Sequence, residues 1–104
     1  MNLAHKKIAP AWDAERRELR LGLVMVKEFR QPAKNQETIL AAFQEENWPP
    51  RIDDPLPGGD NRDARKRLHN TVNRLNRQPV RMIRFLLDGT GQGILWELRK
   101  FAKG

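Results

Sequence analysis

The chain contains no cysteine and no serine, and it has only two histidines, at positions 5 and 69. The lack of cysteine excludes disulfides and thiol chemistry, and the lack of serine excludes a serine nucleophile. The two histidines are far apart in the sequence, so a metal site would need several carboxylate ligands instead. We therefore expect no enzyme, no metal site and no other cofactor. A chain without cysteine is typical of the cytoplasm.

Long apolar runs are also missing. No stretch approaches the roughly 18 consecutive apolar residues of a membrane span, so we expect no membrane partner. The opening residues, MNLAHKKIAPAW, lack the apolar centre of a signal peptide. A chain of 104 residues is long enough for one hydrophobic core but not for two. We expect residues 1–9 to form a loose tail and residues 10–104 to form a single domain.

Acidic residues are scarce in one part of the chain only. Residues 1–60 hold nine lysines and arginines against ten acidic residues, whereas residues 61–104 hold eleven against three. The formal net charge of +7 is therefore the sum of −1 and +8. A basic part beside a near-neutral part is typical of a nucleic-acid-binding face. The alternative, in which the cations only keep the domain soluble, does not require such segregation.

The first half of the chain begins with a pattern of short strands. Residues 18–29, ELRLGLVMVKEF, place Leu19 and Leu21 on one face before Gly22, and an apolar run follows. Gly22 suits a tight turn between two strands, because glycine adopts conformations that strain other residues. We expect residues 12 and 13 to form a third short strand.

A helix is expected next, at residues 36–47, QETILAAFQEEN, with Asn35 as its N-cap. One face of this helix would be apolar and would hold Ile39, Leu40 and Phe43. The following segment, residues 48–60, contains four prolines and two glycines, which end the helix and predict a loop. A loop of this length in a small domain is typical of a functional segment or of a hidden short turn of helix.

Residues 62–78, RDARKRLHNTVNRLNRQ, predict an amphipathic helix with Asp60 as its N-cap. The apolar stripe of this helix consists of Ala64, Leu68, Val72 and Leu75. The opposite side is centred near Lys66 and Arg77, includes Arg62, His69, Asn70 and Asn73, and has Arg74 on its flank. These residue types can both contact phosphates and form hydrogen bonds with base edges.

Residues 81–99, RMIRFLLDGTGQGILWELR, predict a β-hairpin with its turn at Thr90 and Gly91. This register pairs Leu87 with Ile94, Phe85 with Trp96, and Ile83 with Leu98 on one apolar face, and Arg84 with Glu97 and Met82 with Arg99 on the other. A shift by one residue would destroy the pattern, so the pattern favours this register. The three glycines suit a hairpin tip, since strands and not a helix flank them.

Three segments resemble parts of one known family. WDAERRELRLGLVMVKEF, at residues 12–29, is similar to the opening strands of that family, and TVNRLNRQ, at residues 71–78, is similar to the end of its recognition helix. IRF and DGTGQGILWEL, within residues 83–98, are similar to its closing hairpin. The family is the OmpR-type effector domain, the winged helix-turn-helix of bacterial response regulators. The order of the three segments is a stronger signal than any one of them.

The resemblance implies an α+β fold, namely a winged helix with short N-terminal antiparallel strands, two to three helices and a C-terminal β-hairpin wing. It also implies that DNA is faced by Asn70, Asn73, Arg74 and Asn76, and that Arg77 contacts a phosphate. Basic positions of the family are often asparagine here, and asparagine can bind adenine bidentately. Residues 48–60 have room for one short turn but not for the full helix that precedes the recognition helix in the family.

The chain is therefore predicted to bind double-stranded DNA, either sequence-specifically or generally, as a small transcriptional regulator would. Phosphates would be contacted by Arg62, Lys66, Arg74 and Arg77; bases by Asn70 and Asn73, with His69; and the flanking DNA by Arg81, Arg84, Thr90 and Gln92. A domain of this size contacts too little DNA for high specificity, so we expect a homodimer or a protein partner.

Two other functions are open at this point. A winged helix can serve as a protein-interaction module, and residues 48–60 with Glu45 and Glu46 would then form the contact surface. Binding of single-stranded RNA would need exposed aromatic side chains for stacking. The basic part has few of these, because Phe85 and Trp96 are expected in the core.

Overall fold

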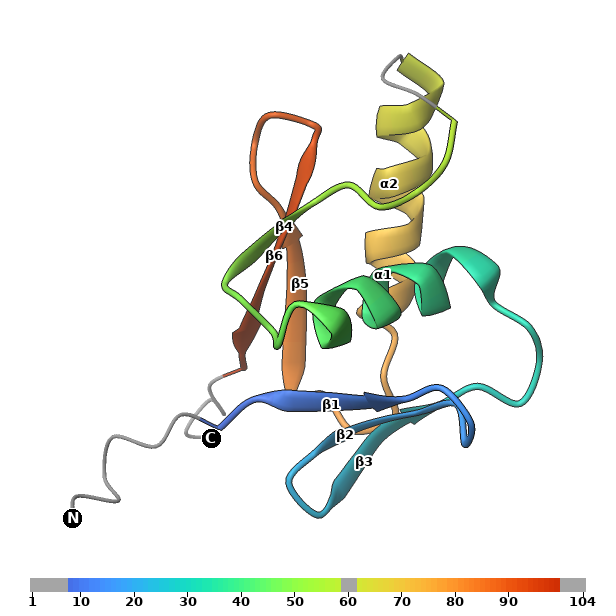
Figure 1. The fold of residues 1–104 in the computed structure, drawn as a ribbon, viewed down its shortest axis with the longest axis vertical. Helices are drawn as coiled ribbons and strands as arrows, with labels where there is room; N and C mark the ends of the chain where they lie inside the picture. The colour runs from blue at the N-terminus through green and yellow to red at the C-terminus, as the bar shows by residue number, and fades with distance from the viewer. Residues whose placement is uncertain (1–7, 59–61, 100–104) are drawn as a thin grey trace, which may run out of the picture.

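The structure, a computed structural model, describes residues 8–58 and 62–99. Within these ranges the fold is α+β, with two helices and two three-stranded antiparallel sheets (Figure 1). In chain order the elements are β1 (Pro10–Asp13), β2 (Glu18–Leu21), β3 (Val24–Glu28), α1 (Lys34–Glu45), β4 (Arg51–Asp53), α2 (Arg62–Leu75), β5 (Ile83–Leu87) and β6 (Gly93–Leu98). Neither of the two described helices is long and apolar enough to cross a membrane. Of the tail expected at residues 1–9, only residues 8 and 9 are described.

The N-terminal sheet has the strand order β1-β2-β3, which confirms the three short strands that the sequence predicted. Leu19 and Leu21 of β2 are buried together, because alternate residues of a strand face the same side. Trp12 of β1 is buried as well. Gly22 makes the turn between β2 and β3 with a φ of 60°, a conformation that strains residues with a side chain.

The helix expected at residues 36–47 is α1, and it begins earlier, at Lys34. The prediction of Asn35 as the N-cap is wrong, because the N-cap is Ala33, which has no capping side chain. A carboxylate oxygen of Glu37 accepts the backbone N–H of Ala33 at 3.0 Å. Arg17 holds that carboxylate through Nε at 3.0 Å and Nη2 at 2.8 Å. A contact with a distant part of the chain therefore supports the start of α1.

α1 ends in a Schellman motif, one of the common ways to satisfy the last carbonyls of a helix. Asn47 has a φ of 63°, and its N–H donates to the Gln44 carbonyl at 3.1 Å. The N–H of Trp48 donates to the Phe43 carbonyl at 2.8 Å. The rings of Trp48 and Phe43 stack with their centroids 4.9 Å apart, which supplies the hydrophobic contact of the motif.

Residues 48–60 are not the plain loop that their composition predicted, and the described part of them contains no turn of helix. Instead β4 pairs antiparallel with β6 and places Ile52 opposite Ile94. Both isoleucines are buried. A strand of three residues is too short to show an alternating pattern, and its partner comes much later in the chain. The sequence pattern alone therefore missed it.

The C-terminal hairpin has the predicted register. Ile83 pairs with Leu98, Arg84 with Glu97, Phe85 with Trp96 and Leu87 with Ile94, and the Arg99 N–H donates to the Met82 carbonyl at 2.9 Å. The apolar face is buried only in part: Ile83, Phe85 and Ile94 are buried, whereas Leu87, Trp96 and Leu98 are partly exposed. The second sheet has the order β4-β6-β5, so β5 is an edge strand.

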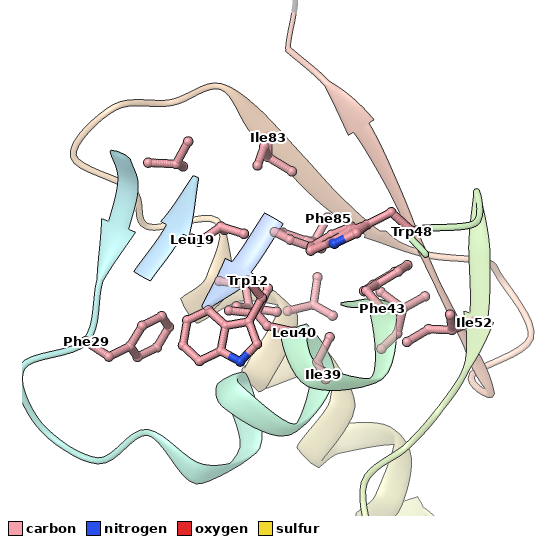
Figure 2. Packing of buried hydrophobic residues seen from close by; sticks show 14 of the residues in the cluster. Trp12, Leu19, Phe29, Ile39, Leu40, Phe43, Trp48, Ile52, Ile83 and Phe85 are labelled. Carbon is pink, nitrogen blue, oxygen red and sulfur yellow. The ribbon is translucent and has the colours of Figure 1, made fainter. Parts of the chain in front are cut away.

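One hydrophobic core joins the two sheets and the two helices. Figure 2 shows Ile39, Leu40 and Phe43 of α1 among the side chains of both sheets. Trp48 extends the core toward the second sheet, with its ring centroid 6.4 Å from that of Phe85. α2 packs against α1 and β5, so the core fixes the helix beside the hairpin.

Candidate nucleic-acid interface

α2 buries the apolar stripe that the sequence predicted. Ala64, Leu68, Val72 and Leu75 are buried, together with Thr71. The other side of the helix is exposed and holds Arg62, Lys66, His69, Asn70, Asn73 and Arg74. Asp63 in the first turn and Arg74 in the last turn both have favourable charges for the helix dipole. Asp60, the expected N-cap, lies outside the described residues.

The helix ends at Leu75 and not at residue 78, because the residues that follow bind the edge of β5. The Asn76 carboxamide donates to the Phe85 carbonyl at 2.9 Å and accepts the Phe85 N–H at 2.8 Å. Gln78 bonds in the same way to the carbonyl and N–H of Ile83, at 2.8 Å and 3.3 Å, and also donates to the Leu75 carbonyl. Asn76, which the resemblance placed toward DNA, thus has its carboxamide occupied by β5.

The tip of the hairpin is held by Asp88. One of its carboxylate oxygens accepts the N–H of Thr90 at 2.9 Å and the Thr90 hydroxyl at 2.7 Å, and the other accepts Nε of Arg51 at 2.7 Å. The Thr90 hydroxyl and then the Arg51 guanidinium lower the pKa of Asp88 from 3.8 to about 2. Thr90, a predicted DNA contact, therefore shapes the tip, and Gln92 is exposed beside it.

The hairpin tip approaches α2 at Gly91. This residue has a φ of 81°, and a Cβ atom placed on it would lie 3.0 Å from Cδ and 3.1 Å from Cγ of Arg65. The backbone conformation therefore favours glycine, and a larger residue would also have to displace the Arg65 side chain by a few tenths of an ångström. Arg65 was not among the predicted contact residues, although its place beside Lys66 in the basic helix could have indicated it. It brings a further cation of α2 to the hairpin tip.

A groove of about 290 Å³ lies between α2 and β5. Its lining includes His69, Val72, Asn73, Arg84, Phe85 and Leu87. Nδ2 of Asn73 lies 3.2 Å from Nε2 of His69, a hydrogen bond that holds the two side chains together on the helix surface. Four predicted contact residues, His69, Asn73, Asn76 and Arg84, thus meet around a single concave surface.

Six predicted contact cations have no carboxylate partner in the described part of the chain. Between described residues, the salt bridges hold Arg17, Arg20, Arg30 and Arg51. The six predicted contact cations lie outside these salt bridges, and all are exposed: Arg62, Lys66, Arg74, Arg77, Arg81 and Arg84. Exposed cations outside salt bridges produce a positive potential that attracts an anionic partner.

Lys27 of β3 is a cation at the end of α2 that sequence reasoning missed. Its Nζ donates to the Arg74 carbonyl at 2.6 Å and lies 5.3 Å from the centroid of the Phe29 ring. Burial, and then repulsion by Arg77, lower its pKa from 10.5 to about 8. No local pattern indicates this contact, because β3 and α2 are far apart in the sequence.

Within residues 8–58 and 62–99, no group of three or more histidine, aspartate or glutamate side chains could hold a metal ion. The polar chemistry of the α2–β5 surface is instead that of amide, imidazole and guanidinium groups. No protein-family model matches the chain, and no curated protein or solved structure matches it either.

Proposed function

We propose that the exposed side of α2 and the β5–β6 hairpin form a binding surface for double-stranded DNA, with α2 as a recognition helix and the hairpin as a wing. The observation that carries this proposal is the row of unpaired cations along one helix and the neighbouring hairpin. Phosphate contacts supply most of the affinity of DNA-binding proteins, and they need cations that no carboxylate has neutralised. We propose a small transcriptional regulator in the cytoplasm as the biological setting.

The order of the elements supports a winged-helix arrangement. A three-stranded sheet, α1, β4 and α2 precede the hairpin, and β4 joins the hairpin in one sheet (Figure 1). The described residues between β4 and α2 contain no helix, so the usual helix before a recognition helix has no counterpart in residues 54–58. The proposed surface therefore depends on α2 and the wing alone.

The exposed residues have separate roles in this proposal. Phosphates are contacted by Arg62, Lys66, Arg74 and Arg77. Arg81, just before the wing, and Arg84, in the wing, contact further phosphates. Bases are contacted by Asn70, Asn73 and His69, whose side chains can form hydrogen bonds with base edges in the major groove. Asn76 is left out, since its carboxamide holds β5.

The test is binding to a labelled duplex of random sequence across a series of salt concentrations. With about six phosphates neutralised, log K falls against log salt with a slope of about −5.4. The double variant Lys66→Glu, Arg74→Glu removes two of these contacts and makes the slope less steep by about 1.8. Arg16→Glu with Lys34→Glu is the matched control, because it changes the net charge equally at two exposed residues outside the salt bridges, one in the turn between β1 and β2 and one at the start of α1.

The control variant is expected to keep the wild-type slope, which would show that position and not total charge matters. A flat slope, or equal losses in the two double variants, would refute the DNA-binding surface. The protein-interaction function of residues 48–60 would then be the next to test. The apparent mass on the duplex, measured by sedimentation, shows whether a homodimer binds, as the small contact area of one domain suggests.

A further inference from the structure

The outer edge of β5 carries backbone groups that do not bond to β6. The Asp88 N–H donates to the Gly93 carbonyl at 3.1 Å, and the Arg99 N–H donates to the Met82 carbonyl at 2.9 Å. Even-numbered residues of this strand thus bond to β6, because hydrogen-bonded and non-hydrogen-bonded pairs alternate along an antiparallel ladder. The N–H and carbonyl groups of residues 83, 85 and 87 therefore point to the opposite side, toward α2.

Two of these three outward-facing residues are satisfied by carboxamide side chains. Gln78 bonds to both backbone groups of Ile83, and Asn76 bonds to both backbone groups of Phe85. Leu87 is the next residue in the row, and no described residue forms a hydrogen bond with its backbone. Leu87 also lines the groove between α2 and β5. The groove thus presents one unused donor and one unused acceptor side by side.

The groove has the size and the lining for a flat polar group. Its volume is about 290 Å³, and one water occupies about 30 Å³ of the liquid, so a group of roughly ten heavy atoms fits. Leu86 and Leu87 are partly exposed and contribute apolar surface, and the His69–Asn73 pair contributes polar atoms. Arg84 lines the groove as an exposed cation. A planar heterocycle joined to a phosphate matches this combination.

We propose that the groove binds an unpaired nucleobase, whose edge forms with the Leu87 backbone the two hydrogen bonds that the Asn76 carboxamide forms with Phe85. Adenine suits this role, because its amino group and adjacent ring nitrogen offer a donor beside an acceptor, as a carboxamide does. Arg84 contacts the phosphate of the same nucleotide. This inference rests on the proposed DNA binding and adds to it a preference for DNA with a displaced base.

A peptide strand could also pair with the edge of β5. The row is open only at Leu87, however, since Asn76 and Gln78 already cover Phe85 and Ile83. With a single open residue, a peptide strand could form only one pair of backbone hydrogen bonds. A base needs only that one pair, and its ring also occupies the groove. The exposed cations also favour a phosphate-bearing ligand.

The test compares three duplexes that differ at one position: fully paired, with one bulged adenine, and with an abasic site in place of that adenine. The wild-type protein is expected to bind the bulged adenine about tenfold more tightly than either of the others. Leu87→Pro removes the outward N–H without removing a bond to β6, and proline is tolerated at such edge positions. Leu87→Ala is the matched control, because it shortens the side chain and keeps the N–H.

The preference is expected to vanish in Leu87→Pro and to fall less in Leu87→Ala, because only the proline variant loses the N–H. Should Leu87→Pro fail to fold, the backbone amide signal of Leu87 in the wild-type protein is the readout. That signal is expected to shift when the bulged duplex is added and to stay unchanged with the paired one. Salt-dependent binding without a preference for the bulge would overturn the base site and leave DNA binding intact. No binding to any of the three duplexes would overturn both, and a peptide library would then be tested against the edge of β5.

Discussion

Replacing Gln78 by methionine is expected to destabilise the protein strongly, although methionine has a similar volume. Gln78 is only 7% exposed and is one of two buried polar residues in the described chain. Its carboxamide bonds to the Leu75 carbonyl at 2.9 Å, to the Ile83 carbonyl at 2.8 Å, and to the Ile83 N–H at 3.3 Å. Methionine fills the space but leaves these three backbone groups without their partner.

The magnitude follows from these three groups. A buried polar group without a partner costs about 1–3 kcal/mol, and the longest of the three bonds contributes least. Water can reach the edge of β5 in part, so we expect a loss of about 2–4 kcal/mol in the free energy of unfolding. For a domain of this size that corresponds to a fall in the melting temperature of about 10–25 °C. The loss is a large part of the stability of a small domain.

The assay is urea unfolding followed by tryptophan fluorescence, with Gln31→Met as the control. Gln31 is exposed, so its replacement is expected to change the free energy of unfolding by no more than about 0.5 kcal/mol. Hydrogen exchange of the Ile83 amide gives a second readout, because that N–H loses its acceptor. Equal stability of the two variants would refute the conclusion that Gln78 holds β5 to the end of α2.

Two further predictions concern α1 and Lys27. Asn47 has a φ of 63°, which only glycine adopts freely, so Asn47→Ala is expected to lower the free energy of unfolding by about 1 kcal/mol. Asn47→Gly is expected to leave it unchanged or to raise it. Thermal melting of the wild type and the two variants checks this order, and an Asn47→Ala variant as stable as the wild type would contradict it. The pKa of Lys27 is lower in the folded chain, about 8, than its usual 10.5. The unfolded chain therefore binds more protons between these values, and the contribution of Lys27 to stability rises as pH increases from about 8 to 10.5. Urea unfolding over this pH range should show a rise in the free energy of unfolding that is larger in the wild type than in Lys27→Met. Parallel curves for the two proteins would contradict the lowered pKa of Lys27.

The hairpin was the part of the fold most fully readable from the sequence. Its strands are close in the chain and its turn is marked by glycines, so the alternation of apolar and polar residues left one satisfactory register. The apolar stripe of α2 was readable for the same reason, since a helix brings together residues three and four apart. The exposed cations of the candidate surface follow directly from that stripe, because they occupy the other side of the same helix.

Other features depended on contacts between segments that are distant in the sequence. Asn35 looked like a better N-cap than Ala33, but the Arg17–Glu37 pair supports the earlier start of α1. The residues around Ile52 showed no strand pattern, yet they pair with β6 and form β4 of the second sheet. Asn76 was predicted to contact DNA from its position near the end of the basic helix. In the structure its carboxamide binds the edge of β5 instead.

The sequence by itself determined the apolar faces of α1 and α2 and the hairpin register, because these depend on residues close to one another in the chain. It also determined the segregation of positive charge. The tertiary structure decided which polar side chains remain available. Asn73 and Asn76 belong to the same stretch and the same residue type, but Asn76 meets β5 and Asn73 faces the groove. The physical reason is that a carboxamide binds whichever backbone groups lie beside it, and the packing of α2 against β5 sets which those are.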